Sequence, residues 1–321
     1  MNAIKQTTRM IDLDGGQPNH TDPSMIASDI SRDTTTSTDA ALVERRARIH
    51  SMWAAVAPAW TQNADYVDAR GAASVKALLE LSAPQPGDRV LDLACGLGGL
   101  GIAASPLVGP AGHVVLSDVV PDMVAFASDR VAKMGLANVS AQIRDIESIH
   151  EPDASFDVVV CREGLMFALD PALAAAEIRR VLRPGGRAAL AVWGPRERNP
   201  WLGIVLDCVS AQIGKQLPPP GMPGPFALQD SNRLVEVLMR GGLIDVAVTE
   251  LDSPLHMSSF EEWWTRTSAL AGPIANLLAT MAQPTMEALQ TRLRRAVQPY
   301  ENSTGLQFPG VTLLASARCP G

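Results

Sequence analysis

VLDLACGLGG, residues 90–99, is the stretch that decides the fold of this chain. An apolar run that contains one acid, Asp92, leads directly into glycines. Such a run is typical of a buried parallel strand that feeds a tight turn and the start of a helix. Because glycine has no Cβ, Gly96 and Gly98 let a ligand approach the backbone closely. The stretch therefore predicts a nucleotide-like cofactor at the carboxyl end of the first strand of an α/β sheet.

The glycines alone fit two kinds of cofactor. Gly96, Gly98 and Gly101 satisfy the G-x-G-x-x-G pattern of dinucleotide-binding proteins. Asp118 ends the next apolar run, roughly 20 residues downstream, where a carboxylate can accept hydrogen bonds from ribose hydroxyls. NAD and S-adenosylmethionine both carry an adenosine with free ribose hydroxyls, so these two signals leave both cofactors open.

Further segments of the sequence distinguish the two cofactors, because they resemble the motifs of one protein family. Residues 90–98 resemble the first motif of class I S-adenosylmethionine-dependent methyltransferases. Three segments follow in that family's order and spacing: LSDVVPDM at 116–123, RDIE at 144–147 and SFDVVVC at 155–161. EIRRVLRPGGR, residues 177–187, matches the family's helix, turn and fifth strand, and dinucleotide-dependent dehydrogenases do not usually carry it. The branch that includes the ubiquinone/menaquinone C-methyltransferases is the most similar, over about residues 85–195.

The resemblance implies an α/β fold: a Rossmann-like seven-stranded sheet, mostly parallel with an antiparallel last strand, with helices on both faces and a helical cap. The cofactor it implies is S-adenosyl-L-methionine. Gly96 and Gly98 would admit its methionine half, and Asp92 would order the turn or meet the amino group. Asp118 would accept hydrogen bonds from the ribose. The other expected cofactor contacts are Val119, Met123, Asp145 and Ile146 around the adenine, and Arg162 after the fourth strand.

The patterns divide the chain into four zones. Residues 1–38 are rich in Thr, Ser, Asp and Gly without apolar periodicity, and they are expected to form a disordered tail. Residues 39–83 are expected to form helices that close over the cofactor, and residues 84–195 to form the S-adenosylmethionine-binding core. Residues 196–321 are expected to complete the sheet and to carry helical insertions, including residues 253–306, that cap the substrate.

The composition narrows the class of partner. A net charge of −7, from 27 basic and 34 acidic residues, argues against a nucleic-acid-binding protein. The four cysteines form no C-x-x-C pair, so neither a disulfide scaffold nor a metal site is expected. No run reaches the ~18 apolar residues needed to span a bilayer, and the N-terminus lacks an apolar signal core. The sequence predicts a soluble, cytoplasmic protein without stable membrane insertion, and a homodimer stays open.

The sequence indicates less clearly which residues would bind the molecule that accepts the methyl group. Glu163 and His256 are candidate bases, although Glu163 equally suits a salt bridge with Arg162 and a lone histidine is more often structural. Large apolar side chains outside the core are expected to line a pocket for a small, apolar molecule. These candidate substrate contacts are Met166, Trp201, Phe226, Trp263 and Trp264. If the insertion does not form the pocket, the N-terminal helices around Trp53 and Trp60 are the alternative place for it.

The implied function is S-adenosylmethionine-dependent methyl transfer to a small, apolar molecule, on carbon, oxygen or nitrogen. Two alternatives belong to other classes. One is a non-catalytic binding protein that keeps the cofactor fold. The other is an NAD(P)-dependent oxidoreductase, which a Tyr-x-x-x-Lys pair would favour; Tyr66 and Tyr300 are the only tyrosines and neither fits.

Overall fold

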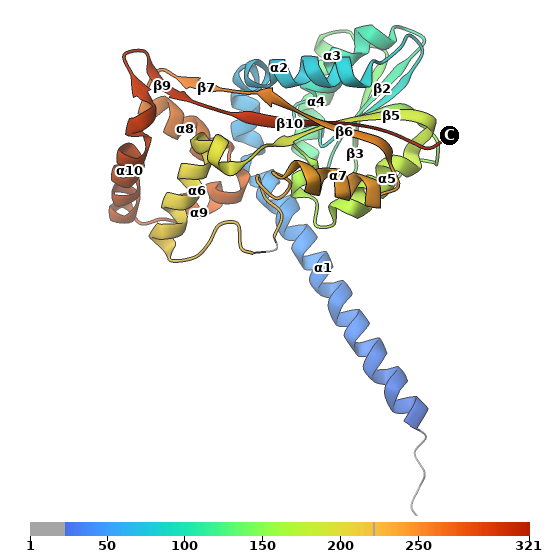
Figure 1. Cartoon of the computed structure of the whole chain (residues 1–321), viewed down its shortest axis with the longest axis horizontal. Helices are drawn as coiled ribbons and strands as arrows, with labels where there is room; N and C mark the ends of the chain where they lie inside the picture. Colours follow the sequence, from blue (N-terminus) through green and yellow to red (C-terminus); the bar gives the residue numbers. More distant parts are fainter. Residues whose placement is uncertain (1–22, 221) are drawn as a thin grey trace, which may run out of the picture. The chain divides into compact units, whose positions relative to one another are not determined.

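A computed structural model describes residues 23–220 and 222–321, with side chains from residue 42 onward except that of Pro273 (Figure 1). The chain divides into two compact units, residues 1–45 and 46–321. The second unit holds the sheet and the site that follows from it.

The second unit is built on a seven-stranded sheet with the order β3-β2-β1-β4-β5-β10-β6. Six strands run in one direction, and β10 lies antiparallel between β5 and β6. The strands are β1 Arg89–Leu93, β2 His113–Asp118, β3 Val139–Ile143, β4 Phe156–Arg162, β5 Leu182–Trp193, β6 Ile244–Asp252 and β10 Val311–Arg318. The predicted seven-stranded sheet with one antiparallel strand is confirmed.

Helices cover both faces of the sheet, as predicted. Successive residues of a strand point to opposite faces. Accordingly Val158 and Val160 of β4 pack in one apolar cluster, while Val159 and Cys161 pack in another. Figure 1 shows α2 and α3 on one face and α5 and α7 on the other. The helices are α1 Pro23–Gln62, α2 Ala64–Ser82, α3 Gly99–Val108, α4 Pro121–Lys133, α5 Pro171–Val181, α6 Pro200–Ile213, α7 Ser231–Arg240, α8 Phe260–Leu270, α9 Gly272–Ala279 and α10 Gln283–Val297.

The strand order places a crevice at the middle of the sheet. From β1 the chain moves outward through β2 and β3, and it then returns to the other side of β1 to form β4. Ligands of open α/β sheets bind where the order reverses in this way, outside the carboxyl ends of the strands. The fold therefore predicts that a ligand binds at the loops that follow β1, β2 and β4.

The insertion between β6 and β10 is not wholly helical, so the prediction for residues 253–306 was incomplete. Besides α8, α9 and α10 it contains a small sheet of order β7-β9-β8. These strands are β7 Leu255–Met257, β8 Glu301–Asn302 and β9 Gly305–Phe308. Each has at most four residues, which is too short for an alternating pattern to stand out from the helices around it.

The first helix begins earlier than predicted. Residues 1–22 of the expected disordered tail lie outside the described residues, but α1 already begins at Pro23, so residues 23–38 are helical and the expected start near residue 39 was wrong. Periodicity could not reveal this part because its sequence has no apolar face. Extending an existing helix costs far less than nucleating one, so a segment without such a face can still be helical.

Two features concern metals and membranes. Among the helices that the structure describes, none is both long and apolar enough to cross a membrane. Within the described residues, no three His, Cys, Asp or Glu side chains gather closely enough to hold a metal ion.

Candidate functional site

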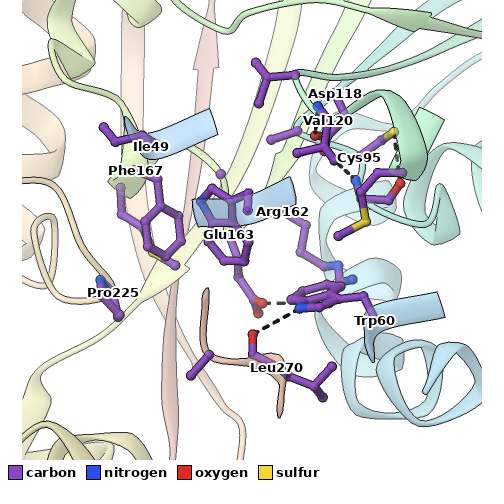
Figure 2. Close-up of a pocket in the computed structure, with 18 of the residues that line it drawn as sticks. Ile49, Trp60, Cys95, Asp118, Val120, Arg162, Glu163, Phe167, Pro225 and Leu270 are labelled. Carbon is purple, nitrogen blue, oxygen red and sulfur yellow. Dashed lines mark hydrogen bonds and ion pairs between the residues drawn. The ribbon is translucent and has the colours of Figure 1, made fainter. Parts of the chain in front are cut away.

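A cavity of about 250 Å³ lies at the carboxyl ends of the central strands (Figure 2). The loops after β1, β2, β3 and β4 form one side of it. Residues 46–60 of α1, with parts of α2, α6, α8 and α9, form the other. All of these segments belong to the second unit.

The glycine loop after β1 is a left-handed turn. Gly96 and Gly98 have φ angles of 54° and 82°, which side chains rarely adopt. A Cβ on Gly96 would lie in van der Waals contact with the Trp60 ring, 3.7 Å away, on the side that faces the cavity. The third glycine has a different reason: a Cβ on Gly101 would lie 2.2 Å from Leu116, so Gly101 lets α3 pack on the sheet. Only the first part of the motif faces the cavity.

Asp118, at the end of β2, holds the glycine loop. Its Oδ2 accepts a hydrogen bond from the Gly96 N–H at 2.9 Å, and its Oδ1 accepts from the Val120 N–H at 3.0 Å. Burial raises the pKa of this carboxyl, and the backbone hydrogen bonds oppose that rise. Each carboxylate oxygen has a second lone pair. Asp118 can therefore order the loop and still accept from a ligand in the cavity.

Only one of the two carboxylate oxygens of Asp92, near the end of β1, has a hydrogen-bond partner. Its Oδ2 accepts from the Gly101 N–H at 2.8 Å, whereas its buried Oδ1 has no hydrogen-bond partner. Burial raises the pKa of Asp92 to about 7, against the Gly101 hydrogen bond and the nearby charge of Arg162. A buried acceptor without a partner is costly, so it invites a donor or a cation from a ligand.

The loop after β3 is tied to α1. The Oδ1 of Asp145 accepts from the Glu147 N–H at 2.8 Å. Its Oδ2 lies 3.2 Å from Arg46 Nε and 3.4 Å from His50 Nε2. Ile146 lines the cavity beside Asp145, and Val119 and Met123 line it from the loop after β2 and from α4. The structure thus gathers every residue predicted to contact the cofactor around one cavity except Gly98, which sits in the turn behind it.

Only some of the predicted acceptor residues reach this cavity. Glu163, Met166 and Trp201 line it. Glu163 follows β4 with a φ of 62°, a conformation that carries strain in a residue other than glycine and that is common at functional sites. Its carboxylate lies 3.9 Å from Arg162 Nη1, so the two predicted partners do form an ion pair (Figure 2).

The other acceptor candidates do not line the cavity, so their predicted place is corrected. Trp263 is fully buried between Phe260 and Phe308, and Trp264 packs half-buried against the same core. Phe226 is buried beneath Arg196, and His256 is exposed on the short strand β7. The large rings belong to the apolar core that also covers one face of the sheet, so they stabilise the fold instead of facing a ligand.

Comparisons with known proteins assign the core of the chain. Residues 84–200 match the family model of a methyltransferase domain. The ubiquinone/menaquinone biosynthesis C-methyltransferase of Ectopseudomonas mendocina is 39% identical over 133 residues, which are 41% of this chain and 52% of that protein. Its counterpart from Teredinibacter turnerae is 41% identical over 113 residues, 35% of this chain and 45% of that protein. The chain thus spans about half the length of the curated relatives it matches.

Residues 84–200 are therefore similar to methyltransferase domains. The predicted resemblance to the class I S-adenosylmethionine-dependent family is confirmed for this part of the chain. Among solved structures, a Bacillus halodurans protein described as a candidate methyltransferase has a TM-score of 0.54 at 20% identity, over 77% of this chain and 99% of that one. The YcgJ protein of Bacillus subtilis gives 0.54 at 19% identity, over 77% and 98%. At such identities these likenesses concern the fold.

Much of the cavity wall comes from outside residues 84–200, and most of these wall residues were not predicted from the sequence. Trp53 and Trp60 were foreseen only as a fallback pocket, and Tyr66 and Arg70 were missed. A signal existed, because residues seven or four apart share a helix face. The spacing of Trp53 with Trp60, and of Tyr66 with Arg70, could have placed each pair on one wall.

Proposed function

We propose that this chain transfers a methyl group from S-adenosylmethionine to a small, apolar acceptor molecule. The observation that carries the proposal is Asp118: a buried carboxylate at the end of β2 that holds Gly96 in place and retains lone pairs beside an open cavity. It belongs to a domain that matches the methyltransferase family.

Several groups in the cavity wall support this cofactor. The unpartnered Oδ1 of Asp92 suits a donor or cation at the amino-acid end. The bare backbone at Gly96 leaves room where a Cβ would otherwise stand. Asp118 suits the two ribose hydroxyls, and Val119 with Met123 supplies apolar surface for the adenine. Asp145 would meet the adenine amino group with lone pairs that Arg46 and His50 do not occupy.

When bound, S-adenosylmethionine supplies a methyl group on a sulfonium leaving group. The chain's own task is then to hold an acceptor atom in line with that bond and to keep water out. Trp53, Phe167 and Leu270 give the cavity apolar walls for this purpose. Glu163, in its strained conformation, is the candidate group to take a proton from the acceptor.

The small acceptor is favoured by the enclosed apolar walls and by the net charge of −7. Ubiquinone and menaquinone biosynthesis, named for the two bacterial relatives, concerns planar ring compounds, and a planar apolar acceptor is our proposal for this chain. A cytoplasmic location and a homodimer remain predictions from the sequence.

Calorimetric titration of the purified chain with S-adenosylmethionine, S-adenosylhomocysteine and NADH tests the proposal. We expect one site per chain for both sulfur compounds and no heat from NADH. Binding of NADH alone would favour an oxidoreductase. Absence of binding by all three would favour a protein that keeps the fold without the cofactor.

A further inference from the structure

One arginine of the cavity differs from the rest. Five arginines line it: Arg46, Arg70, Arg144, Arg162 and Arg266. Four of them have a carboxylate within 4.0 Å: Asp145 and Glu147 for Arg46, Glu151 for Arg144, Glu163 for Arg162 and Glu262 for Arg266. Within the described part of the chain, Arg70 has none. It is therefore a cation in the cavity wall whose charge no ion pair balances.

Arg70 lies against aromatic rings. Its guanidinium carbon is 5.6 Å from the centre of the Trp193 ring and 5.7 Å from that of Trp201. The two rings meet edge to face, with centres 4.9 Å apart. One hydrogen bond runs from Arg70 Nη2 to the Ser253 carbonyl at 3.1 Å. A guanidinium has five N–H donors, so most of its donor capacity is left for a ligand.

The charge at this wall is costly without a ligand. Burial lowers the pKa of Arg70, and the charge of Glu163 opposes the change. Glu163 already pairs with Arg162, so it balances Arg70 only in part. A guanidinium stays protonated even so, and a partly buried cation gains from an anion placed beside it. A carboxylate could accept two parallel N–H···O bonds from it, one at each oxygen, and a phenolate oxygen could accept a charge-assisted bond.

A different arginine, Arg162, lies near Asp92, where the amino-acid end of the cofactor is proposed to bind. Arg162 is close enough to Asp92 to lower the pKa of that carboxyl. Arg70 instead shares its wall with Trp193 and Trp201. These neighbours assign Arg70 to the acceptor.

We propose that Arg70 is the specificity-determining contact for an acceptor that carries an anionic oxygen on a planar ring, the ring lying against Trp193 and Trp201. The inference rests on the proposed methyl transfer and refines its acceptor from a wholly apolar molecule to an apolar ring that carries one anionic group. A carboxylate and a phenolate share this chemistry.

The test uses two probes of one shape, 2-naphthoate and its neutral amide 2-naphthamide, with the full chain saturated in S-adenosylhomocysteine. Binding is followed by quenching of tryptophan fluorescence. The wild-type chain should bind the anion at least about tenfold more tightly than the amide, because the bond to a charged partner is the stronger one. A parallel titration with 2-naphtholate at alkaline pH distinguishes the phenolate from the carboxylate.

Substitutions of Arg70 distinguish a role in binding the acceptor from a structural role. Arg70→Met should lower naphthoate affinity about tenfold and leave naphthamide and S-adenosylhomocysteine binding unchanged. Arg70→Lys should restore part of the preference. Arg198→Met, which removes an exposed arginine paired with Glu250 outside the cavity, should change none of these values.

The proposal is overturned if the wild-type chain binds both naphthalenes equally or binds neither. It is also overturned if Arg70→Met lowers S-adenosylhomocysteine affinity instead, because Arg70 would then hold the cofactor. Failure of S-adenosylhomocysteine to bind the wild-type chain would reject the proposed function itself, so the two failures are distinguishable.

Discussion

Asp92 and Asp118 end neighbouring strands, yet their carboxylates have different partners. Asp118 accepts from two backbone N–H groups of the loops around it. Asp92 accepts from one and leaves the other oxygen buried and unpaired. The first carboxylate is therefore part of the loop's own structure, while the second is completed only by a ligand.

Asp118→Ala should weaken both binding and folding. S-adenosylhomocysteine affinity should fall at least about tenfold, because the ribose loses its acceptor. From the sequence alone the stability without ligand is expected hardly to change, but in the structure two backbone donors also lose their partner, at roughly 1–3 kcal/mol each. Calorimetry and thermal melts measure the two effects. Asp122→Ala, at an exposed acid of α4, is the control, and an unchanged affinity in Asp118→Ala would remove the ribose assignment.

Asp92 should make stability depend on pH. Its pKa in the folded chain, about 7, exceeds its ordinary value of 3.8, so the folded state holds more protons than the unfolded one between these values. The free energy of unfolding contributed by this group therefore falls as pH rises through that window.

In Asp92→Asn the side chain cannot titrate. The free energy of unfolding of the variant should therefore rise relative to that of the wild-type chain between about pH 5 and about pH 8, by up to ~3 kcal/mol. Urea unfolding at a series of pH values measures the difference. A difference that stays constant with pH would show that Asp92 is ionised throughout.

At the scale of elements, α1 and α8 are joined at the wall of the cavity. The Trp60 Nε1–H donates to the Leu270 carbonyl at 3.0 Å (Figure 2). Arg266 donates to the Asn63 side chain at 3.2 Å and stacks on Tyr66, 4.3 Å from the ring centre. Gly272 leaves room for the Trp53 ring, which a Cβ there would approach to 3.1 Å. These contacts form a clasp between the N-terminal helices and the insertion.

Trp60→Phe should loosen this clasp and leave the fold intact. The variant keeps an aromatic ring but loses one hydrogen bond, worth about 1 kcal/mol, so the melting temperature should fall only slightly. Amide hydrogen exchange should accelerate in residues 266–274, and S-adenosylhomocysteine should dissociate faster. Trp264→Phe, at a ring that does not line the cavity, should change neither. Equal exchange rates in Trp60→Phe and wild type would mean that the clasp does not depend on this bond.

At the scale of the whole molecule, the sequence predicted the strands and the loops that follow them. It did not predict the cavity wall that forms where segments distant in the sequence meet. The strands, their direction and the loops around Gly96, Asp118 and Asp145 follow from local patterns, because a buried parallel strand and a glycine turn have strong local signatures. The cavity's other wall does not. Arg70 and Trp201 meet only because α2 and α6 pack over the same strand ends, and no local pattern encodes that meeting.

The tail can be tested by truncation. Deletion of residues 1–38 should leave the melting temperature and S-adenosylhomocysteine affinity unchanged, because that segment has little apolar surface to bury. Circular dichroism should lose some helical signal, since α1 begins at Pro23. A melting temperature lower by many degrees would mean that the removed segment stabilises the second unit.

The central claim is that the cavity at the carboxyl ends of β1 and β2 holds S-adenosylmethionine. A crystal structure of the full chain with S-adenosylhomocysteine tests it most directly. We predict ribose hydroxyls on the Asp118 carboxylate, the amino group near Asp92 and the adenine beside Ile146. A ligand bound elsewhere on the chain, or in this cavity with its ribose away from Asp118, would contradict the account.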